Sequence, residues 1–439
     1  MKAIISDKTY LTGLGDDQIK FIQKSLIIPN PKYTDAIRQG RRPFGIDRTI
    51  ELYESTDDGL VIPRGIHLDG LIDIDDRRHS HPVEIETSIE PRAYQERALS
   101  AMLETGGGVL VAPTGSGKTT IGIELAARLR QRCLVLVKSL DLARQWQGAI
   151  KKFTGLDAGL IGGGEWREGD QFTIATVQTL IKHQGSLDYG LLICDECHNA
   201  PANQVYAVIN RQAAKYRFGL SATPQRRDNL EALMFASLGP VCAEIEQHEV
   251  EGAVLPVVVK TVECDFTGDP QSWSEFLQML SDDPERNKLI VNSAIKASRK
   301  TGVAILTATV DHAERLTAMI EQQGLDAVLL HGKLPAKQKA EAMQRAETAN
   351  LIIGTLSLLS EGIDWPHVGA VIFGAPVSAV IDKNIPAATR LIQSIGRARR
   401  PYPGKQRAFV LDIVDQCGFG VGAWRKRNHV YRMHGFDVI

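Results

Sequence analysis

The chain has 439 residues, of which 43% are hydrophobic and 23% charged, and its formal net charge is −1. This is the composition of an ordinary globular protein, long enough for two or three domains with separate cores. A net charge near zero excludes a global basic field, so any nucleic-acid site must be local. No apolar run approaches the ~20 residues of a membrane span, and the amino terminus has no hydrophobic signal region. We therefore expect a protein without membrane contact, in the cytoplasm or, if its source is eukaryotic, in the nucleus.

The six cysteines are scattered along the chain, and one pair, Cys194 and Cys197, has the C-x-x-C spacing of a zinc or redox site. No second pair accompanies it in the sequence, as a four-cysteine zinc site would require. Reduced, buried thiols are the preferred interpretation, and metal binding is the alternative.

Residues 1–88 differ from the rest of the chain because apolar residues are sparser and turn signals are dense. A short helix is predicted over 18–25, and 49–54 and 59–63 resemble a hairpin pair around the turn at 57–59. We expect a small α+β accessory domain with a possible role in DNA recognition.

Basic residues gather in this region with aromatic residues between them. They could contact phosphates beside an aromatic wedge or stacking platform, and the alternative is an ordinary solvated face. The basic residues are Lys32, Arg38, Arg41, Arg42 and Arg48, and the aromatic ones are Tyr33 and Phe44. Further along, His79 and His81 lie in a polar linker or edge strand. Nothing near them in the sequence completes a set of metal ligands, so we interpret them as neighbouring surface histidines.

From Pro91 onward, short apolar strands alternate with amphipathic helices, a pattern that predicts parallel sheets covered by helices. In such sheets, ligands bind at the carboxyl ends of the strands. The first series of strands is predicted at 108–112, 133–137, 172–176, 191–194 and 217–220. The second series is predicted at 303–307, 327–330, 351–354, 370–373 and 408–413.

These patterns divide the chain into an accessory domain at 1–88, a first α/β domain at 89–245, a connecting segment at 246–285 and a second α/β domain at 286–439. The connecting segment is less regular and rich in acidic residues. Only the first α/β domain has a glycine–lysine–threonine loop, so two similar sheets are expected to share one nucleotide.

That loop follows the first predicted strand and leads into a helix, which is the context that a phosphate-binding loop requires. Its glycines let the backbone wrap around an anion, Lys118 would neutralise the β- and γ-phosphates, and Thr119 would bind Mg²⁺. The loop residues expected at the nucleotide are Pro113, Thr114, Gly115, Ser116, Gly117, Lys118, Thr119 and Thr120.

The segment Leu191–His198 is an apolar strand that ends in two carboxylates, Asp195 and Glu196. Beside a phosphate-binding loop, Asp195 can hold Mg²⁺ together with Thr119, and Glu196 can orient and deprotonate the attacking water. The sequence therefore predicts a site that cleaves a nucleoside triphosphate.

The segment Asp195-Glu-Cys-His198 is similar to the DExH box of superfamily 2 helicases, and the family's other motifs follow in order over about residues 90–415. This resemblance implies two tandem RecA-like parallel-sheet domains, ATP with Mg²⁺ as cofactor, and adenine contacts at Arg92 and Gln95. It also implies motif V at 354–364 and motif VI at 393–400. The residues carried over from these two motifs are Gly362, Asp364, Gln393, Arg397 and Arg400, and the two arginines, three apart on a helix, are expected to act as arginine fingers.

Nucleic acid is expected to cross the carboxyl ends of both sheets, held mainly by phosphate contacts. By family position, the candidates are Lys138, Arg144, Thr176, Gln178, His331 and Thr355. Near the carboxyl terminus, 424–427 and 431–432 interleave aromatic and basic residues, which favours either a DNA-contacting surface or a solvated helix end.

The residues at the motif positions resemble those of the branch that contains the XPB-like and phage UvsW-like DNA helicases. The resemblance implies a monomeric motor that remodels duplex, forked or four-way-junction DNA in replication, recombination or repair. Two alternatives remain open: an RNA-directed DExH ATPase or sensor, and the motor subunit of a restriction or defence complex.

Overall fold

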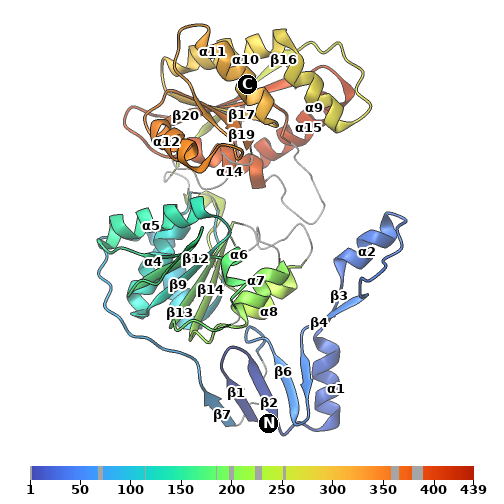
Figure 1. Cartoon of the computed structure of the whole chain (residues 1–439), viewed down its shortest axis with the longest axis vertical. Coiled ribbons are helices and arrows are strands. Elements are labelled where there is room, and N and C mark those ends of the chain that lie inside the picture. Colours follow the sequence, from blue (N-terminus) through green and yellow to red (C-terminus); the bar gives the residue numbers. More distant parts are fainter. Residues whose placement is uncertain are drawn as a thin grey trace. The chain divides into compact units, whose positions relative to one another are not determined.

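The computed structural model divides the chain into two compact units, Met1–Glu249 and Val250–Ile439 (Figure 1). The residues that the structure describes are 2–67, 73–113, 115–183, 185–196, 202–222, 230–250, 254–356, 365–377 and 389–439.

None of the helices formed by these described residues combines the length and the apolar character that crossing a membrane requires.

The first unit begins with a small α+β domain, as the sequence predicts. Its main sheet has the strand order β5-β6-β2-β1-β7, and β3 and β4 form a separate two-stranded ribbon. The strands are β1 (Lys2–Ile5), β2 (Thr9–Thr12), β3 (Ile27–Pro29), β4 (Thr49–Glu51), β5 (Glu54–Thr56), β6 (Gly59–Ile62) and β7 (Asp73–Asp76), and the helices are α1 (Asp16–Ser25) and α2 (Pro31–Arg38).

The expected hairpin at 49–63 is only half correct. Strand β6 pairs with β5 across the turn at 57–58, but β4 pairs with β3 instead. The ribbon and α2 therefore form an arm that projects from the domain (Figure 1).

The α+β domain packs on the α/β domain that follows it. Leu230, Leu233 and Ala236 share a hydrophobic core with residues of the α+β domain such as Leu60 and Ile62. Beside this core, buried Arg217 donates a 2.7 Å hydrogen bond to the carbonyl oxygen of Asp7. Burial lowers the pKa of Arg217 to about 9. Apolar contact and buried guanidinium groups together hold the two parts of this unit in one body.

The large sheet of the first unit has the strand order β11-β10-β12-β9-β13-β14-β8-β15, and the described pairs are parallel except for β10 with β11. Its strands are β8 (Gly107–Val111), β9 (Cys133–Val137), β10 (Gly159–Gly162), β11 (Glu165–Arg167), β12 (Phe172–Thr176), β13 (Leu191–Asp195), β14 (Tyr216–Ser221) and β15 (Val241–Glu244).

Helices cover both faces of this sheet (Figure 1). They are α3 (Ala93–Thr105), α4 (Lys118–Leu129), α5 (Leu140–Thr154), α6 (Val177–Leu180), α7 (Ala202–Ile209) and α8 (Glu231–Leu238), with a 3₁₀ turn at η1 (Gln247–Val250). Local chemistry sets their limits: the Ser139 hydroxyl accepts the Leu142 amide at the start of α5, and Gly155 ends that helix at φ 73°. Gly122 of α4 lies against Trp146 of α5, where a Cβ would come within 2.8 Å of the indole ring.

The second unit is a parallel sheet with the strand order β18-β19-β17-β20-β21-β16-β22. Its strands are β16 (Val257–Cys264), β17 (Gly302–Thr307), β18 (Val328–Leu330), β19 (Leu351–Thr355), β20 (Val368–Phe373), β21 (Ala408–Asp415) and β22 (Asp437–Val438). Its helices are α9 (Trp273–Asp282), α10 (Pro284–Ser298), α11 (Val310–Glu321), α12 (Ala336–Ala346), α14 (Thr389–Ala398) and α15 (Gly418–Met433).

The expectation of a connecting segment over 246–285 is wrong for most of its length. Strand β16 lies inside the second sheet, where it pairs with β21 over eight residues and with β22 on its other side. Its first three residues, Val257, Val258 and Val259, are buried, whereas the rest of the strand is partly exposed. The acidic residues around it lie on α9 and the neighbouring loop, and they concealed the strand in the sequence.

The expected basic surface at the carboxyl terminus also needs correction. Arg427 is fully buried and forms a two-pronged ion pair with Asp412, at 2.8 Å for each hydrogen bond, and the Tyr431 hydroxyl donates to the same carboxylate at 2.8 Å. Arg425 and Lys426 are exposed on the other side of α15. The aromatic and basic residues therefore divide between core and solvent, because the helix turns about 100° per residue.

Candidate nucleotide site and strand ends

The loop predicted to bind phosphate joins β8 to α4 at the carboxyl edge of the first sheet. Gly115 and Gly117 adopt φ values of 92° and 83°, in the left-handed region that glycine enters without steric strain. The Lys118 ammonium donates to the carbonyl oxygens of Ala112 at 3.0 Å and Pro113 at 3.4 Å, so it lies across the mouth of the loop. Thr119 and Thr120 begin α4, and Thr114 falls outside the described residues.

Gln95 braces this loop from α3. Its side-chain amide donates to the Ser116 carbonyl oxygen at 2.8 Å, and its Oε1 accepts the Arg92 backbone N–H at 2.9 Å. A Cβ at Gly117 would come within 2.5 Å of the Gln95 amide nitrogen, so that position requires glycine for space as well as for φ. Arg92 itself is exposed and hydrogen-bonds the Tyr94 hydroxyl at 3.2 Å. The structure thus gives Gln95 a role in fixing the loop, while an adenine contact by either residue stays a prediction.

The paired carboxylates lie at the end of β13, two strands from β8 with β14 between them. Glu196 Oε1 is 3.9 Å from the Lys118 ammonium, so the sheet brings together residues that are 78 positions apart. Glu196 adopts φ 52°, a left-handed conformation that is rare for residues other than glycine. Strain of this kind is concentrated at functional sites, where it sets the direction of a side chain.

Asp195 is buried and points in a different direction from Glu196. Its Oδ2 accepts a 2.7 Å hydrogen bond from the indole N–H of Trp146, which is itself fully buried on α5. Burial, together with the negative charge of Glu196, raises the pKa of Asp195 to about 6, although the Trp146 hydrogen bond opposes both effects. Burial disfavours the charged form of Asp195, whereas a cation bound beside it would favour that form.

The site residues expected from the sequence do not include Trp146, so its hydrogen bond to Asp195 was missed. Residues 137–146 are similar to motif Ia of the superfamily 2 helicases, and the position of Trp146 in that segment is the signal that could have found it. A tryptophan on a helix face is nevertheless most often packed for its apolar area alone, so the sequence pattern did not distinguish the two roles.

The nucleic-acid candidates of the first unit lie at the carboxyl edge of its sheet, beyond the strands β9 and β12. Lys138 directly follows β9, and Arg144 is exposed on α5, 3.8 Å from Asp141. Thr176 is the last residue of β12, is 6% exposed and shares a 2.8 Å hydroxyl–hydroxyl hydrogen bond with Thr179. Gln178 is exposed on α6. Their contact with nucleic acid stays a prediction.

The second unit holds the matching positions at its own strand ends. Thr355 is the last residue of β19, as Thr176 is of β12. His331 follows β18 and is buried, with Nε2 3.7 Å from Glu314 Oε1. Both positions lie at the carboxyl edge of a parallel sheet, as the sequence predicts.

The arginines expected to act as fingers do not share one helical face. Arg397 is on the last turn of α14, where it lines a small cavity with Trp365 and Ser394. Arg400 lies beyond the end of the helix, because α14 stops at Ala398, and burial lowers its pKa to about 10. Gly362, Asp364 and the side chain of Gln393 lie outside the described residues.

A residue between these two arginines has a contact that the sequence did not predict. Arg399 is 9% exposed and donates through Nε to the carbonyl oxygen of Leu255 at 3.0 Å, while the Leu255 N–H bonds the Arg399 carbonyl oxygen at 2.7 Å. Arg399 therefore attaches the start of the second unit to the end of α14.

Comparison with known protein families agrees with this arrangement. Residues 88–226 match the family described as "Type III restriction enzyme, res subunit", and residues 285–401 match "Helicase conserved C-terminal domain". The two matches fall in order on the two parallel sheets. The chain belongs to the superfamily 2 helicases. It is therefore an ATP-hydrolysing helicase built from two RecA-like domains.

This helicase is similar to named proteins from an archaeon and a virus. It is 29% identical to a "DNA 3'-5' translocase XPB2" of Sulfurisphaera tokodaii over 57% of this chain and 51% of that protein. It is 26% identical to a "Putative ATP-dependent RNA helicase L396" of Acanthamoeba polyphaga mimivirus over 92% of this chain and 79% of the viral protein. The helicase thus spans about half the length of the archaeal relative.

Among solved structures, this helicase resembles S. cerevisiae Dbp5 bound to RNA and ADP BeF3. The TM-score is 0.59 at 18% identity, and the match covers 80% of this chain and 90% of Dbp5. At this identity the likeness establishes the fold of the two RecA-like domains.

Proposed function

We propose that this helicase is an ATP-driven DNA translocase that remodels duplex, forked or four-way-junction DNA, acting as a monomer in the cytoplasm. The observation that supports ATP hydrolysis is the 3.9 Å distance between Glu196 Oε1 and Lys118 Nζ, which follow different strands of one sheet. A base for the attacking water and a cation for the phosphates are then side by side.

The residues present fit a magnesium–nucleotide complex. Asp195 and Thr119 offer the oxygen ligands that Mg²⁺ prefers, and the N–H groups of the glycine loop and of the α4 amino terminus can bind phosphate oxygens. When bound, Mg²⁺ would neutralise charge on the β- and γ-phosphates. Glu196 would take the proton of the attacking water, while Lys118 would hold the γ-phosphate. In the second unit, Arg397 and Arg400 are the proposed arginine fingers, and Gly362, Asp364 and Gln393 the proposed sensors of the nucleotide.

DNA is the proposed substrate because the archaeal relative is named as a DNA translocase. A phosphate-tracking path is proposed along Lys138, Arg144, Thr176 and Gln178 in the first unit and His331 and Thr355 in the second. The name of the mimivirus relative, which matches 92% of this chain, is the observation that favours an RNA-directed helicase as the second candidate.

The test is the ATPase rate of the purified chain with single-stranded DNA, duplex DNA, a four-way DNA junction and RNA of matched length. The DNA proposal predicts that duplex and junction DNA stimulate hydrolysis more than RNA does. Stimulation by RNA alone would contradict the DNA proposal and support the second candidate. Absence of strand displacement by the single chain would favour a motor that needs partner subunits, as in a restriction complex.

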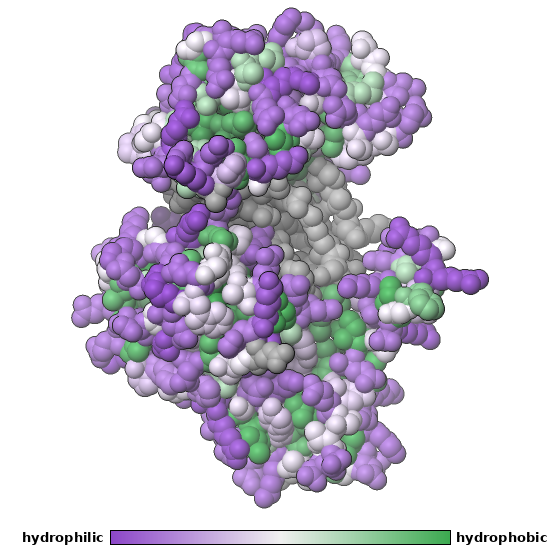
Figure 2. Space-filling view, viewed as in Figure 1, coloured by the Kyte–Doolittle hydropathy of each residue, from purple (hydrophilic) through white to green (hydrophobic). Residues whose placement is uncertain are grey.

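The arm of the α+β domain is proposed to recognise DNA. Phe44, in the loop between α2 and β4, is 99% exposed and Ile37 is 55% exposed, and Arg38, Arg41 and Arg42 are also exposed. Figure 2 shows hydrophobic surface on this arm among hydrophilic residues. An exposed aromatic ring within a basic cluster can stack on unpaired bases or insert at a branch point while the arginines contact phosphates.

Phe44→Ala tests this assignment. We expect it to weaken binding to a four-way junction by about 1–3 kcal/mol, the range for one base–aromatic stacking contact, while the DNA-independent ATPase rate stays unchanged. Phe21→Ala is the control, because Phe21 is 72% exposed on α1, away from the basic cluster. Equal junction affinity of the wild type and Phe44→Ala would exclude Phe44 as a DNA contact.

A further inference from the structure

The segment that joins the α+β domain to the first RecA-like sheet crosses the amino-terminal ends of three strands. The backbone of His79 bonds on both sides, from its N–H to Ala213 O at 2.7 Å and from its carbonyl oxygen to the Lys215 N–H at 2.8 Å. Two residues later, the His81 carbonyl oxygen accepts the Arg132 N–H at 2.8 Å. Because the segment is extended, residues i and i+2 project to the same side. His79 and His81 are therefore held with their rings on one side of a fixed backbone.

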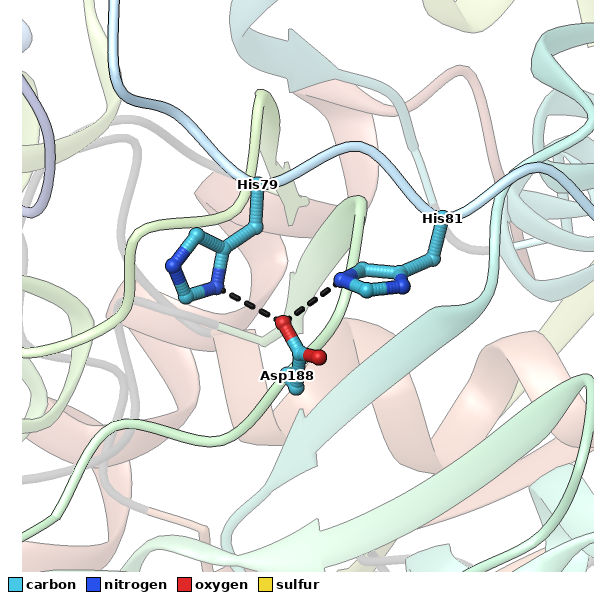
Figure 3. A group of neighbouring side chains, drawn as sticks. All are labelled: His79, His81 and Asp188. Carbon is cyan, nitrogen blue, oxygen red and sulfur yellow. Dashed lines mark hydrogen bonds and ion pairs between the residues drawn. The ribbon is translucent and has the colours of Figure 1, made fainter.

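Both rings converge on Asp188, which precedes β13 and is 107 residues from His81. Oδ1 of Asp188 is 2.9 Å from Nδ1 of His79 and 2.5 Å from Nε2 of His81 (Figure 3). The ring centres are 6.2 Å apart and their planes lie at 87°, so the two imidazoles approach the carboxylate from different directions. The two histidines are neighbours at the surface, as the sequence predicts, with side chains 38% and 36% exposed. The sequence offered no third ligand for this pair because Asp188 is distant in the chain.

The three side chains meet at one point, where Nε2 of His81 and Oδ1 of Asp188 form a 2.5 Å hydrogen bond. Nδ1 of His79 is buried, and although it lies close to Oδ1 it makes no hydrogen bond to any described residue. The donor atoms of the three side chains all lie within 4.8 Å of one another. Zinc ligands stand at about 2.0–2.2 Å from the metal, which puts tetrahedral ligand atoms about 3.3 Å apart.

The surroundings support the carboxylate without blocking the site. The Leu187 N–H donates to Gln212 Oε1 at 2.9 Å, and the Tyr189 hydroxyl donates to Thr173 at 2.7 Å, so both neighbours of Asp188 are fixed. Arg132 donates to the Asp188 carbonyl oxygen, and its charge is partly balanced by Glu168 at 3.2 Å. The side chain of Asp188 is 62% exposed, which leaves room for a water ligand.

We propose that His79, His81 and Asp188 bind a divalent transition-metal ion of the zinc class. Two neutral imidazoles and one carboxylate, with water in the fourth position, form a ligand set that zinc takes readily. The ion would fasten the joining segment to the amino-terminal edge of the sheet, whereas the nucleotide residues lie at the carboxyl edge. Its role is thus to fix the α+β domain on the motor, apart from ATP hydrolysis.

The test uses the full chain, stripped of metal and then titrated with Zn²⁺, with the bound metal counted by elemental analysis after dialysis. We expect one Zn²⁺ per chain in the wild type and a loss of at least about tenfold in affinity for His79→Ala and Asp188→Asn, since even outer-shell changes weaken metal binding about 10–100-fold. His248→Ala is the control, because His248 pairs with a single carboxylate, Glu246, at 3.1 Å.

A second readout does not depend on the variants. Co²⁺ added to the wild type should give the intense visible absorption of a four-coordinate site, and Zn²⁺ should abolish it by displacement. Weak octahedral absorption, or Zn²⁺ affinity that is equal in the wild type and Asp188→Asn, would overturn the proposal and leave an ordinary histidine–aspartate ion pair. ATP hydrolysis that continues after removal of zinc is expected, because the nucleotide residues are elsewhere in the unit.

Discussion

At the scale of single residues, the nucleotide site depends on side chains that are held from outside the motifs. Gln95 fixes the loop carbonyl of Ser116, and Trp146 fixes the carboxylate of Asp195. Neither residue has to contact ATP in order to affect hydrolysis. Each fixes the position of a loop or a side chain that is expected to bind the nucleotide. Positioning of this kind is effective since a misplacement of about 1 Å at a reacting centre can lower a rate about 100-fold.

Trp146→Phe should lower kcat/KM for ATP by about 10- to 100-fold. The change keeps an aromatic ring on α5 but removes the 2.7 Å hydrogen bond to Asp195, and a hydrogen bond to a charged group contributes about 1.5–3 kcal/mol. The measurement is steady-state ATP hydrolysis at pH 7.5. Trp166→Phe is the control, because Trp166 is 47% exposed on β11 and should retain the wild-type rate. An unchanged rate for Trp146→Phe would remove the positioning role.

Because of buried His312, the free energy of unfolding is expected to fall as the pH becomes acidic. It is buried on α11, where Nε2 lies 2.9 Å from Asn287 Oδ1, and burial, with the positive charges of Arg286 and Arg315, lowers its pKa from 6.5 to about 3. A group whose folded pKa is lowered contributes stability that is complete above pH 6.5 and is lost as the pH falls toward 3.

His312→Gln should reduce that loss. At pH 5 the histidine accounts for roughly 2 kcal/mol of the decline from pH 7, at about 1.36 kcal/mol per pKa unit. Urea unfolding of the full chain at both pH values measures it, with exposed His429→Gln as the control. If His312→Gln declines as steeply as the wild type, the buried neutral imidazole is not the cause.

At the scale of elements, buried ion pairs join helices to the sheet of the second unit. Arg427 on α15 meets Asp412 on β21, and Arg286 on α10 meets Asp415 on the same strand at 2.7 Å. All four side chains are 1% exposed or less. Such pairs contribute little net stability as pairs, but loss of one partner leaves a buried charge uncompensated.

Arg427→Met should therefore destabilise the second unit by about 3–5 kcal/mol, because Asp412 would lose its two-pronged partner. Arg425→Met, two residues earlier on the exposed side of the same helix, should change stability by no more than about 0.5 kcal/mol. Thermal unfolding of both variants makes the comparison. Equal effects at the two positions would mean that the buried network is not what holds α15.

The elements that sequence reasoning predicted are those with continuous apolar runs. β9, β12 and β13 were expected at nearly their observed bounds, because strands buried on both faces are apolar throughout. β10 and β11 were missed because they are short and flanked by glycines, and β16 because only its first three residues are buried.

For the site, the motifs within one stretch of chain were predictable, and contacts between distant stretches were not. The approach of Lys118 to Glu196 followed from strand order in a parallel sheet. The hydrogen bond from Trp146 to Asp195, the attachment of Arg399 to Leu255 and the convergence of His79 and His81 on Asp188 join residues that no local pattern connects.

At the scale of the whole molecule, the described residues form four sheets: the main sheet and the two-stranded ribbon of the α+β domain, and one sheet in each RecA-like domain. The α+β domain packs on Leu230 and Leu233, at the start of α8. The second unit has a strand-end threonine like that of the first, but its sequence lacks a phosphate-binding loop. We propose that it supplies cationic side chains to the nucleotide and a second set of contacts to the DNA strand.

The measurement that tests this account most directly is ATP-dependent branch migration of a four-way DNA junction by the purified chain, compared with Glu196→Gln and Lys118→Ala. We predict that the wild type separates the junction into duplex products only with ATP and Mg²⁺. Glu196→Gln should bind ATP but neither hydrolyse it nor move the junction, and Lys118→Ala should abolish turnover. Junction movement by Glu196→Gln at the wild-type rate, or by the wild type without ATP, would contradict the account.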